Sequence, residues 1–303
     1  MTTVEGFAPY GPYRTWYRVT GDLKSGKPPL FVLHGGPGCT HDYVDSFKGL
    51  AARGRAVIHY DQVGNGFSSH LPDKGADFWT VDFFKAELDN LIDHLGVRSA
   101  YHVLGQSWGG MLSAEIAVLR PPGLKSVAIC NSPASMELWM AGCAELVAAL
   151  PADVRDALIR HEEAGTVTDP EYLAATDEFY RRHLCRVVPM PQDLVETIEQ
   201  MEAEPTVYHT MNGPNEFHVI GTMRNWTVIE RLPSITAPVL VVAGEFDEAT
   251  PATWQPYVDH IPDARSHVFP DTSHCTHLEK PEEFRAVIAD FLALHDLAAD
   301  ARV

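Results

Sequence analysis

Short apolar runs alternate with segments of helical spacing along the first part of the chain. Four runs are predicted to be buried strands that end in turn residues: residues 29–36, 55–61, 100–105 and 124–131. Between them, residues 80–96 and 109–120 are predicted to be helices, and Pro121 and Pro122 stop the second one. Strands that alternate with helices form a parallel sheet covered on both faces, so we expect an α/β fold.

The helix predicted over residues 80–96 has the clearest signals. Its apolar side chains fall on one face: Phe84, Leu88, Leu91, Ile92 and Leu95. The hydroxyl of Thr80 can cap the first turn, and Gly96 can end the last one.

The pattern changes over residues 134–231, which contain helical runs and no clear buried strand. Alternation of strand and helix then returns over three segments: residues 237–248, 264–271 and 281–295. We therefore expect a discontinuous α/β core, made of residues 1–133 and 232–303, with residues 134–231 inserted as a helical cap. The cap is expected over one end of a mostly parallel sheet.

Length and composition add mainly exclusions. The 303 residues are 45% apolar and 21% charged, which is ordinary for a soluble globular protein with a sizeable core. No apolar run is long enough to span a bilayer, so no membrane partner is expected. The N-terminus has no basic stretch followed by an apolar one, so no signal peptide is expected.

Cysteine usage and charge exclude two further classes. The five cysteines are scattered and form no CxxC pair, which disfavours a disulfide framework or zinc site and suits the cytoplasm. The net charge of −18 disfavours a nucleic-acid partner, because the phosphate backbone requires a basic face. Most of this charge is expected to be a solubilising surface, with a mild preference for cationic substrates.

The stretch GQSWGG, residues 105–110, carries the first chemical signal. It contains G-x-S-x-G between a predicted strand and a predicted helix, the context in which that motif exposes a nucleophilic serine. A chance turn of glycine and serine is the alternative, and the flanking elements disfavour it. We therefore predict Ser107 as a nucleophile, with the N–H of Trp108 at a helix N-terminus that favours negative charge.

A serine nucleophile needs a base and an orienting carboxylate, which follow it in the order Asp or Glu, then His. Asp247 and His274 each come just after a predicted strand, where loops meet at the carboxyl edge of the sheet. His267 lies inside its predicted strand, and His277 is the main alternative base. No carboxylate or cysteine set completes a metal site with His274 and His277, so no metal is expected.

An oxyanion in this reaction needs two N–H donors. Trp108 is predicted to supply one. The glycine-rich stretch HGGPG, residues 34–38, follows an early predicted strand and is expected to supply the other. Gly36 is the favoured donor and Gly35 the alternative.

Together these stretches resemble the proline iminopeptidase branch of the α/β-hydrolase superfamily over nearly the whole chain. The matching stretches are LHGGPGCTHDY (33–43), HYDQVGNGFSS (59–69), GQSWGGML (105–112), GEFDEATP (244–251) and SHCTHLEKPEEF (273–284). The resemblance implies an α/β-hydrolase fold with a helical cap. It also implies Ser107, Asp247 and His274 as the catalytic triad, in agreement with the assignments above.

The resemblance adds two carboxylates that grip the free α-amino group of the substrate. Glu216 lies in MNGPNEF, residues 211–217, and Glu248 directly follows Asp247. A buried ammonium must be matched by carboxylates, which is the physical basis for this role. The alternative is that both glutamates are solvated loop acids.

Three further features have structural interpretations. Asp61 is expected to accept hydrogen bonds from loop N–H groups rather than to act in catalysis. Cys275 lacks a base of its own and is expected to be a small loop residue. The apolar run over residues 136–150 either lines an apolar substrate channel or packs the cap helices.

We expect a serine hydrolase that cleaves the amide bond after a free N-terminal aminoacyl group through an acyl-enzyme, with no metal or organic cofactor. The substrate is expected to be a small molecule or short peptide with a free amine. The family also includes amino-acid amidases and amidohydrolases that remove an aminoacyl group from macrolactam polyketide intermediates. A carboxylesterase or lactonase with the same triad, and a non-catalytic small-molecule receptor, remain alternatives. The sequence carries no signal of oligomeric state.

Overall fold

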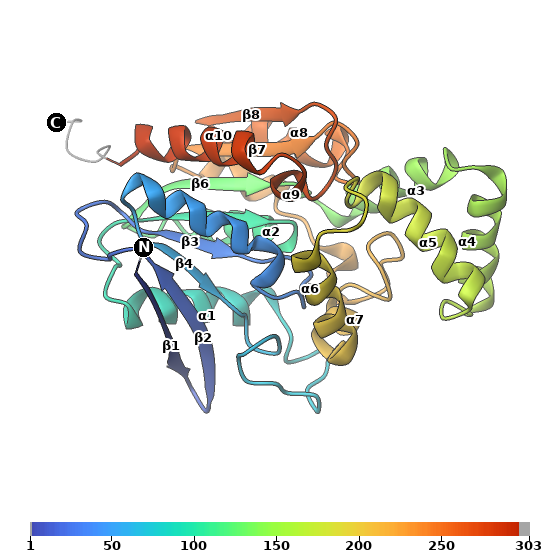
Figure 1. Cartoon of the computed structure of the whole chain (residues 1–303), viewed down its shortest axis with the longest axis horizontal. Helices are drawn as coiled ribbons and strands as arrows, with labels where there is room; N and C mark the ends of the chain where they lie inside the picture. Colours follow the sequence, from blue (N-terminus) through green and yellow to red (C-terminus); the bar gives the residue numbers. More distant parts are fainter. Residues whose placement is uncertain (1, 297–303) are drawn as a thin grey trace.

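The protein is built around one eight-stranded sheet, seen here in a computed structural model that describes residues 2–296. The strands lie in the order β1-β2-β4-β3-β5-β6-β7-β8 (Figure 1). Their bounds are β1 (Thr3–Tyr10), β2 (Tyr13–Thr20), β3 (Leu30–Leu33), β4 (Val57–Tyr60), β5 (Tyr101–Gln106), β6 (Leu124–Cys130), β7 (Val239–Gly244) and β8 (Ala264–Phe269). Strands β3 to β8 are parallel to one another, and β2 is antiparallel to both neighbours.

Helices cover both faces of the sheet because alternate residues of its central strands are buried on opposite sides. Leu30 and Val32 of β3 pack in one apolar cluster with η1 and α10, whereas Phe31 and Leu33 pack in another with α1 and α2. The covering helices are η1 (Asp42–Arg53), α1 (Val81–His94), α2 (Trp108–Val118), α8 (Pro251–His260), α9 (Thr276–Glu279) and α10 (Pro281–Leu294). The expected α/β fold with a mostly parallel sheet is confirmed.

Local signals in the sequence account for several boundaries. Thr80 caps α1 by accepting a hydrogen bond from the N–H of Phe83 at 3.2 Å. Gly96 follows that helix with a φ of +67°, a conformation that glycine adopts without strain. The sequence did not predict the hairpin of β1 and β2, whose edge strand β1 is mostly exposed and has no buried apolar run.

Residues 134–231 contribute helices and no sheet strand. They form α3 (Met136–Ala148), α4 (Ala152–Ala164), α5 (Pro170–His183), α6 (Gln192–Ala203), α7 (Thr206–Met211), η2 (Thr222–Asn225) and the first part of η3 (Ile229–Ser234), which extends past residue 231. Helices α3 to α7 lie beyond the carboxyl ends of the central strands (Figure 1). The hydroxyl of Thr40, in the loop that precedes η1, forms a hydrogen bond of 2.9 Å with the hydroxyl of Thr197 on α6. We propose that residues 134–231 are a cap over a core of residues 1–133 and 232–303.

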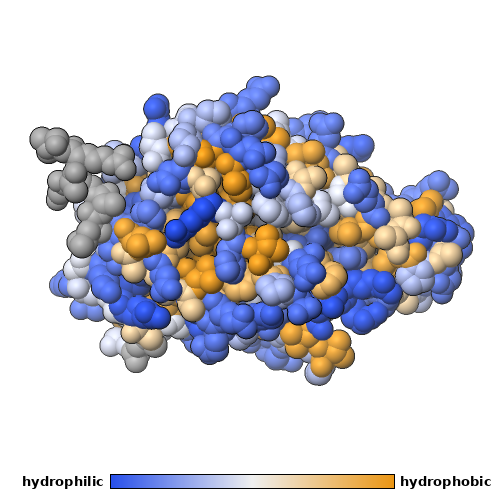
Figure 2. Space-filling view, turned by 90° about the horizontal axis from the view of Figure 1, so that it is seen from above, coloured by the Kyte–Doolittle hydropathy of each residue, from blue (hydrophilic) through white to orange (hydrophobic). Residues whose placement is uncertain are grey.

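The surface and the helices show how polar and apolar residues are distributed. Figure 2 views the side of β8, α8 and α10, where hydrophilic residues predominate and apolar residues form several separate groups. Within residues 2–296, no helix combines the length and apolar character needed to cross a bilayer.

Candidate active site

Ser107 occupies a sharp turn between β5 and α2. Its backbone φ of 56° and ψ of −122° are unusual for a residue with a side chain and store local strain. The glycines on either side are required by close packing. A Cβ at Gly105 would lie 1.9 Å from the carbonyl oxygen of Gly109, and one at Gly109 would lie 2.1 Å from the oxygen of Leu33. The sequence therefore folds into the strained turn because these two positions carry no side chain.

Asp247 and His274 meet at the carboxyl edge of the sheet, after β7 and β8. His274 Nδ1 donates to Asp247 Oδ1 at 2.8 Å, and the N–H of Ala249 donates to the same oxygen at 2.8 Å. The side chain of Asn131 donates to Asp247 Oδ2 at 2.6 Å. Both carboxylate oxygens are thus engaged. In the neutral imidazole, this contact holds the proton on Nδ1 and leaves Nε2 as an acceptor.

The charge of His274 is set by its surroundings. Burial alone lowers the pKa of this imidazole, but the nearby carboxylates of Asp247 and Glu248 outweigh burial and raise the pKa to about 9. His274 and Ser107 line the same cavity. His274 Nε2 has no hydrogen-bond partner among residues 2–296, so no Ser107–His274 hydrogen bond is present. Such contacts are often long or unmade until substrate binds.

The two other candidate histidines lie apart from this pair. His277 is buried in α9, where Nε2 donates to the carbonyl of Tyr43 at 2.9 Å. Burial lowers the pKa of His277 to about 3. His267 lies within β8, as the sequence indicated. The geometry therefore favours His274 over both as the partner of Ser107.

Two backbone N–H groups beside Ser107 are available to an anion. Gly36 and Trp108 line a small hollow together with Ser107, and neither N–H donates to another described residue. The N–H of Gly35, the alternative donor, is already bonded to Tyr43 Oη at 2.7 Å. Gly36 has a φ of +107°, and a Cβ there would lie 2.3 Å from the nitrogen of Gly38. These contacts favour Gly36 and Trp108 as the pair of donors.

Glu216 and Glu248 are unlike solvated loop acids. Glu248 is fully buried, neither carboxyl oxygen has a hydrogen-bond partner among residues 2–296, and Oε1 lies 3.8 Å from His274 Nε2. Glu216 lies between α7 and η2, faces both cavities at the site, and accepts a hydrogen bond from Tyr208 Oη at 2.7 Å. Burial raises the pKa of both carboxyl groups. A bound cation would supply the partner that Glu248 lacks.

Two hollows open from Ser107. The small one has apolar walls contributed by Met111, Pro133, Met136, Trp139 and Met223. The larger one has a volume of about 420 Å³ and extends between α5, α6 and α7. Met136 and Trp139 belong to the apolar run over residues 136–150, so the start of that run lines the site. The ring of Trp139 lies 5.7 Å from that of His274, and its Nε1 donates to the carbonyl of Glu216 at 2.7 Å.

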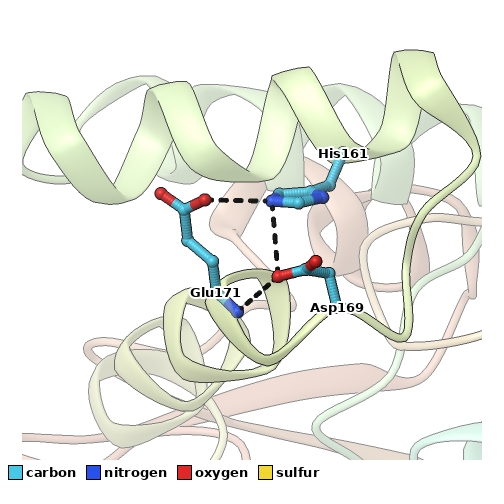
Figure 3. Close-up of side chains that lie close together, drawn as sticks. All are labelled: His161, Asp169 and Glu171. Atoms are coloured by element: carbon cyan, nitrogen blue, oxygen red, sulfur yellow. Dashed lines mark hydrogen bonds and ion pairs between the residues drawn. The ribbon is translucent and has the colours of Figure 1, made fainter.

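A group of side chains with metal-like spacing lies elsewhere, between α4 and α5. His161, Asp169 and Glu171 face one another (Figure 3). Glu171 forms an ion pair with Arg160 at 2.6 Å, and Asp169 caps α5 by accepting from the N–H of Glu171 at 2.9 Å. None of these side chains lines either hollow. The ion pair and hydrogen bonds that these residues already form explain the group as a structural contact between α4 and α5.

Several residues that support the site had no assigned role in the sequence. Asn131 ends the strand predicted over residues 124–131, a position at the carboxyl edge that a search for polar strand ends would find. Tyr208 holds Glu216 from a short helix and had no such signal. Asp61 is buried and accepts from the N–H groups of His41 and Phe67, the loop-supporting role expected for it.

Comparisons with known proteins identify the family. Residues 28–281 match the family model described as the alpha/beta hydrolase fold. The proline iminopeptidase of Lactobacillus helveticus (strain DPC 4571) is 34% identical over 98% of this chain and 100% of its own length. The solved proline iminopeptidase of Mycobacterium smegmatis is 64% identical with a TM-score of 0.92, covering 98% of this chain and 100% of that one. The crystal structure of VinJ is 53% identical with a TM-score of 0.95, covering 96% and 99%. This chain belongs to the proline iminopeptidase family of the α/β hydrolases.

Proposed function

We propose that this protein is a serine hydrolase that cleaves the amide bond after a free N-terminal aminoacyl group. Family membership supports a hydrolase of aminopeptidase type, since the relatives above are named proline iminopeptidases. The observation that carries the proposal is that the buried carboxyl of Glu248, beside the Asp247–His274 pair, has no hydrogen-bond partner among residues 2–296. The five free cysteines suit the reducing cytoplasm in which we place the enzyme.

In the proposed reaction, His274 Nε2 takes the hydroxyl proton of Ser107 as the serine oxygen attacks the substrate carbonyl. Asp247 holds the imidazole and stabilises its charged form. The N–H groups of Gly36 and Trp108 donate to the oxyanion that forms. His274 then protonates the leaving amine, and the C–N bond breaks to give an ester on Ser107. A water molecule, deprotonated by His274, hydrolyses that ester and releases the amino acid.

The free amine of the substrate is recognised by charge. An ammonium group next to Glu216 and Glu248 neutralises two carboxylates that burial otherwise disfavours. An acetylated amine carries no charge and leaves Glu248 unpaired. The enzyme is therefore expected to release only a residue whose amino group is free.

A second candidate concerns the leaving group. The cavity of about 420 Å³ between α5, α6 and α7 is large for an ammonia or p-nitroaniline leaving group. Apolar side chains form much of its wall, among them Leu173, Leu184, Met190, Leu194 and Ile198. This cavity favours an amidohydrolase that removes an aminoacyl group from a bulky hydrophobic amine, such as a macrolactam polyketide intermediate.

The deciding experiment measures hydrolysis of alanyl and prolyl p-nitroanilides, each with a free and an acetylated amine. Wild type is expected to cleave only the free-amine forms, and Ser107→Ala to cleave neither. Equal cleavage of free and acetylated forms would favour a carboxylesterase or lactonase with the same triad. Turnover of no ester or amide, together with a thermal shift on ligand binding, would favour a receptor.

A further inference from the structure

Tyr43 occupies a position where several segments of the site meet. It lies near the start of η1 and is buried. Its backbone N–H donates to Thr197 Oγ1 of α6 at 3.2 Å, and its carbonyl accepts from His277 at 2.9 Å. Its hydroxyl oxygen accepts from the N–H of Gly35 at 2.7 Å. One residue thus joins the glycine-rich loop, the helical segment and the helix after His274.

The hydroxyl of Tyr43 is hydrogen-bonded to a second buried side chain, that of Gln106. Tyr43 Oη donates to Gln106 Oε1, and Gln106 Nε2 donates to the carbonyl oxygen of His274 at 3.1 Å. The carbonyl of His274 can only accept, so the orientation of the Gln106 amide is determined. Gln106 directly precedes Ser107 in the chain. The hydrogen bonds therefore run from Gly35, through two side chains, to the backbone of His274.

Close packing accompanies these bonds. A Cβ at Gly35 would lie 2.6 Å from Tyr43 Oη, 3.0 Å from Ser107 Cβ and 3.1 Å from Gln106 Oε1. Gly35 also supplies the carbonyl of the peptide unit whose N–H belongs to Gly36. A shift of Gly35 consequently moves the proposed oxyanion donor relative to Ser107.

We propose that the Tyr43 hydroxyl is a positioning group that sets the oxyanion loop against Ser107, acting through Gln106. The inference rests on the function proposed above. If the hydroxyl is removed, the buried N–H of Gly35 and the Oε1 of Gln106 each lose a partner. The loop and the turn before Ser107 then adjust separately, and the transition state loses stabilisation while bound substrate does not.

The test is Tyr43→Phe, with Tyr60→Phe as a matched control. Tyr60 is equally buried, and its hydroxyl has no hydrogen-bond partner within residues 2–296. Tyr43→Phe is expected to lower kcat for a free-amine p-nitroanilide about tenfold or more, below the roughly 10²–10³-fold loss from deleting a direct oxyanion donor. Its KM should stay within about twofold of wild type, as expected when only transition-state contacts are lost. Tyr60→Phe should leave kcat unchanged.

A transition-state analogue separates positioning from general destabilisation. Affinity for an aminoacyl boronic acid is expected to fall in parallel with kcat/KM in Tyr43→Phe, while affinity for the product amino acid is retained. Thermal midpoints of both variants report folding. A change confined to KM, an equal loss in Tyr60→Phe, or a kcat within about twofold of wild type would overturn the proposal.

The link through Gln106 has its own test. Gln106→Met keeps the length of the side chain, removes both hydrogen bonds and does not depend on Tyr43→Phe folding. It is expected to lower kcat with little change in KM. The double variant should lose no more than the worse single variant, because both changes break one chain of contacts. Multiplicative losses would overturn the link. Activity remaining in Ser107→Ala would instead refute the function proposed above.

Discussion

Polar side chains have different surroundings in two regions of the molecule: the loops at the carboxyl edge of the sheet, and the helical segment over residues 134–231. At the sheet edge, both oxygens of Asp247 accept hydrogen bonds, and the backbone of Ser107 is locked by glycine packing. In the helical segment, the carboxyl group of Glu216 accepts a hydrogen bond from Tyr208 and faces open cavities, and Leu173 on the cavity wall is 51% exposed. We therefore propose that the loops at the sheet edge fix the groups that react, whereas residues 134–231 contribute a more open surface for the substrate.

Glu248 differs from the other polar residues at the sheet edge. It belongs to the sheet edge and directly follows Asp247, yet neither of its carboxyl oxygens is bonded within residues 2–296. The two neighbours differ because the protein supplies the partners of Asp247, and the substrate is proposed to supply those of Glu248.

The largest expected effect is at Asp247. Asp247→Asn should lower kcat by about 10⁴-fold, because an amide in place of the carboxylate favours the wrong imidazole tautomer. Asp271→Asn is the matched control. Asp271 is exposed on the same loop as His274 and has a φ of 58°, which asparagine also adopts. Steady-state kinetics on a prolyl or alanyl p-nitroanilide measure both variants, and comparable losses in the two would contradict the assignment.

The next effect concerns the amine. Glu248→Gln should lower kcat/KM for free-amine substrates by at least about 10²-fold, since breaking a buried ion pair by removing one partner costs about 3–5 kcal/mol. Any hydrolysis of acetylated substrates, measured at a pH above the midpoint for His274, should be unchanged. Glu245→Gln, an exposed neighbour that accepts one backbone hydrogen bond, should behave as wild type. Equal losses of kcat/KM on free-amine and acetylated substrates would contradict the assignment of Glu248 as a substrate-binding group.

The pH dependence of inactivation tests how Glu248 affects His274, with a reagent that carries no amine. Only neutral His274 accepts the serine proton, so a pKa of about 9 predicts that inactivation by an uncharged organophosphonate accelerates with rising pH up to about 9. The carboxylate of Glu248 helps to raise the pKa of His274. Glu248→Gln should therefore move the midpoint of the profile to lower pH, whereas Glu245→Gln should leave it in place. An identical midpoint in all three proteins would contradict the coupling.

The smallest effect is expected in the helical segment. Leu173→Trp adds bulk to the wall of the 420 Å³ cavity and should slow turnover of a bulky aminoacyl amide several-fold, with alanyl p-nitroanilide unaffected. Ile159→Trp on α4 is the control, because Ile159 is 44% exposed and lines neither hollow. Equal slowing of large and small substrates by Leu173→Trp would show that the cavity does not hold the leaving group.

The sequence predicted features that depend on local pattern. Strands β3 to β7 are largely buried and contain short apolar runs, and Ser107, Asp247 and His274 each follow a predicted strand, so their placement at one edge of the sheet could be expected. The edge strand β1 escaped prediction because its side chains are mostly exposed and carry no such run.

The supporting contacts could not be predicted in the same way. Tyr43 lies 63 residues from Gln106 and 154 from Thr197, and nothing in its immediate sequence indicates either partner. Gln106 stood inside the motif that identified Ser107, but its side-chain contacts depend on how distant loops pack. The unpartnered state of Glu248 is likewise a property of the folded chain.

That state has a consequence for folding. A carboxyl group that is buried without a hydrogen-bond partner lowers the free energy of unfolding. The cost arises either from burying its charge or from the shift of its pKa that keeps it protonated. An ammonium ligand bound at Glu248, as proposed above, would offset this cost, so that the ligand and the native state would stabilise each other.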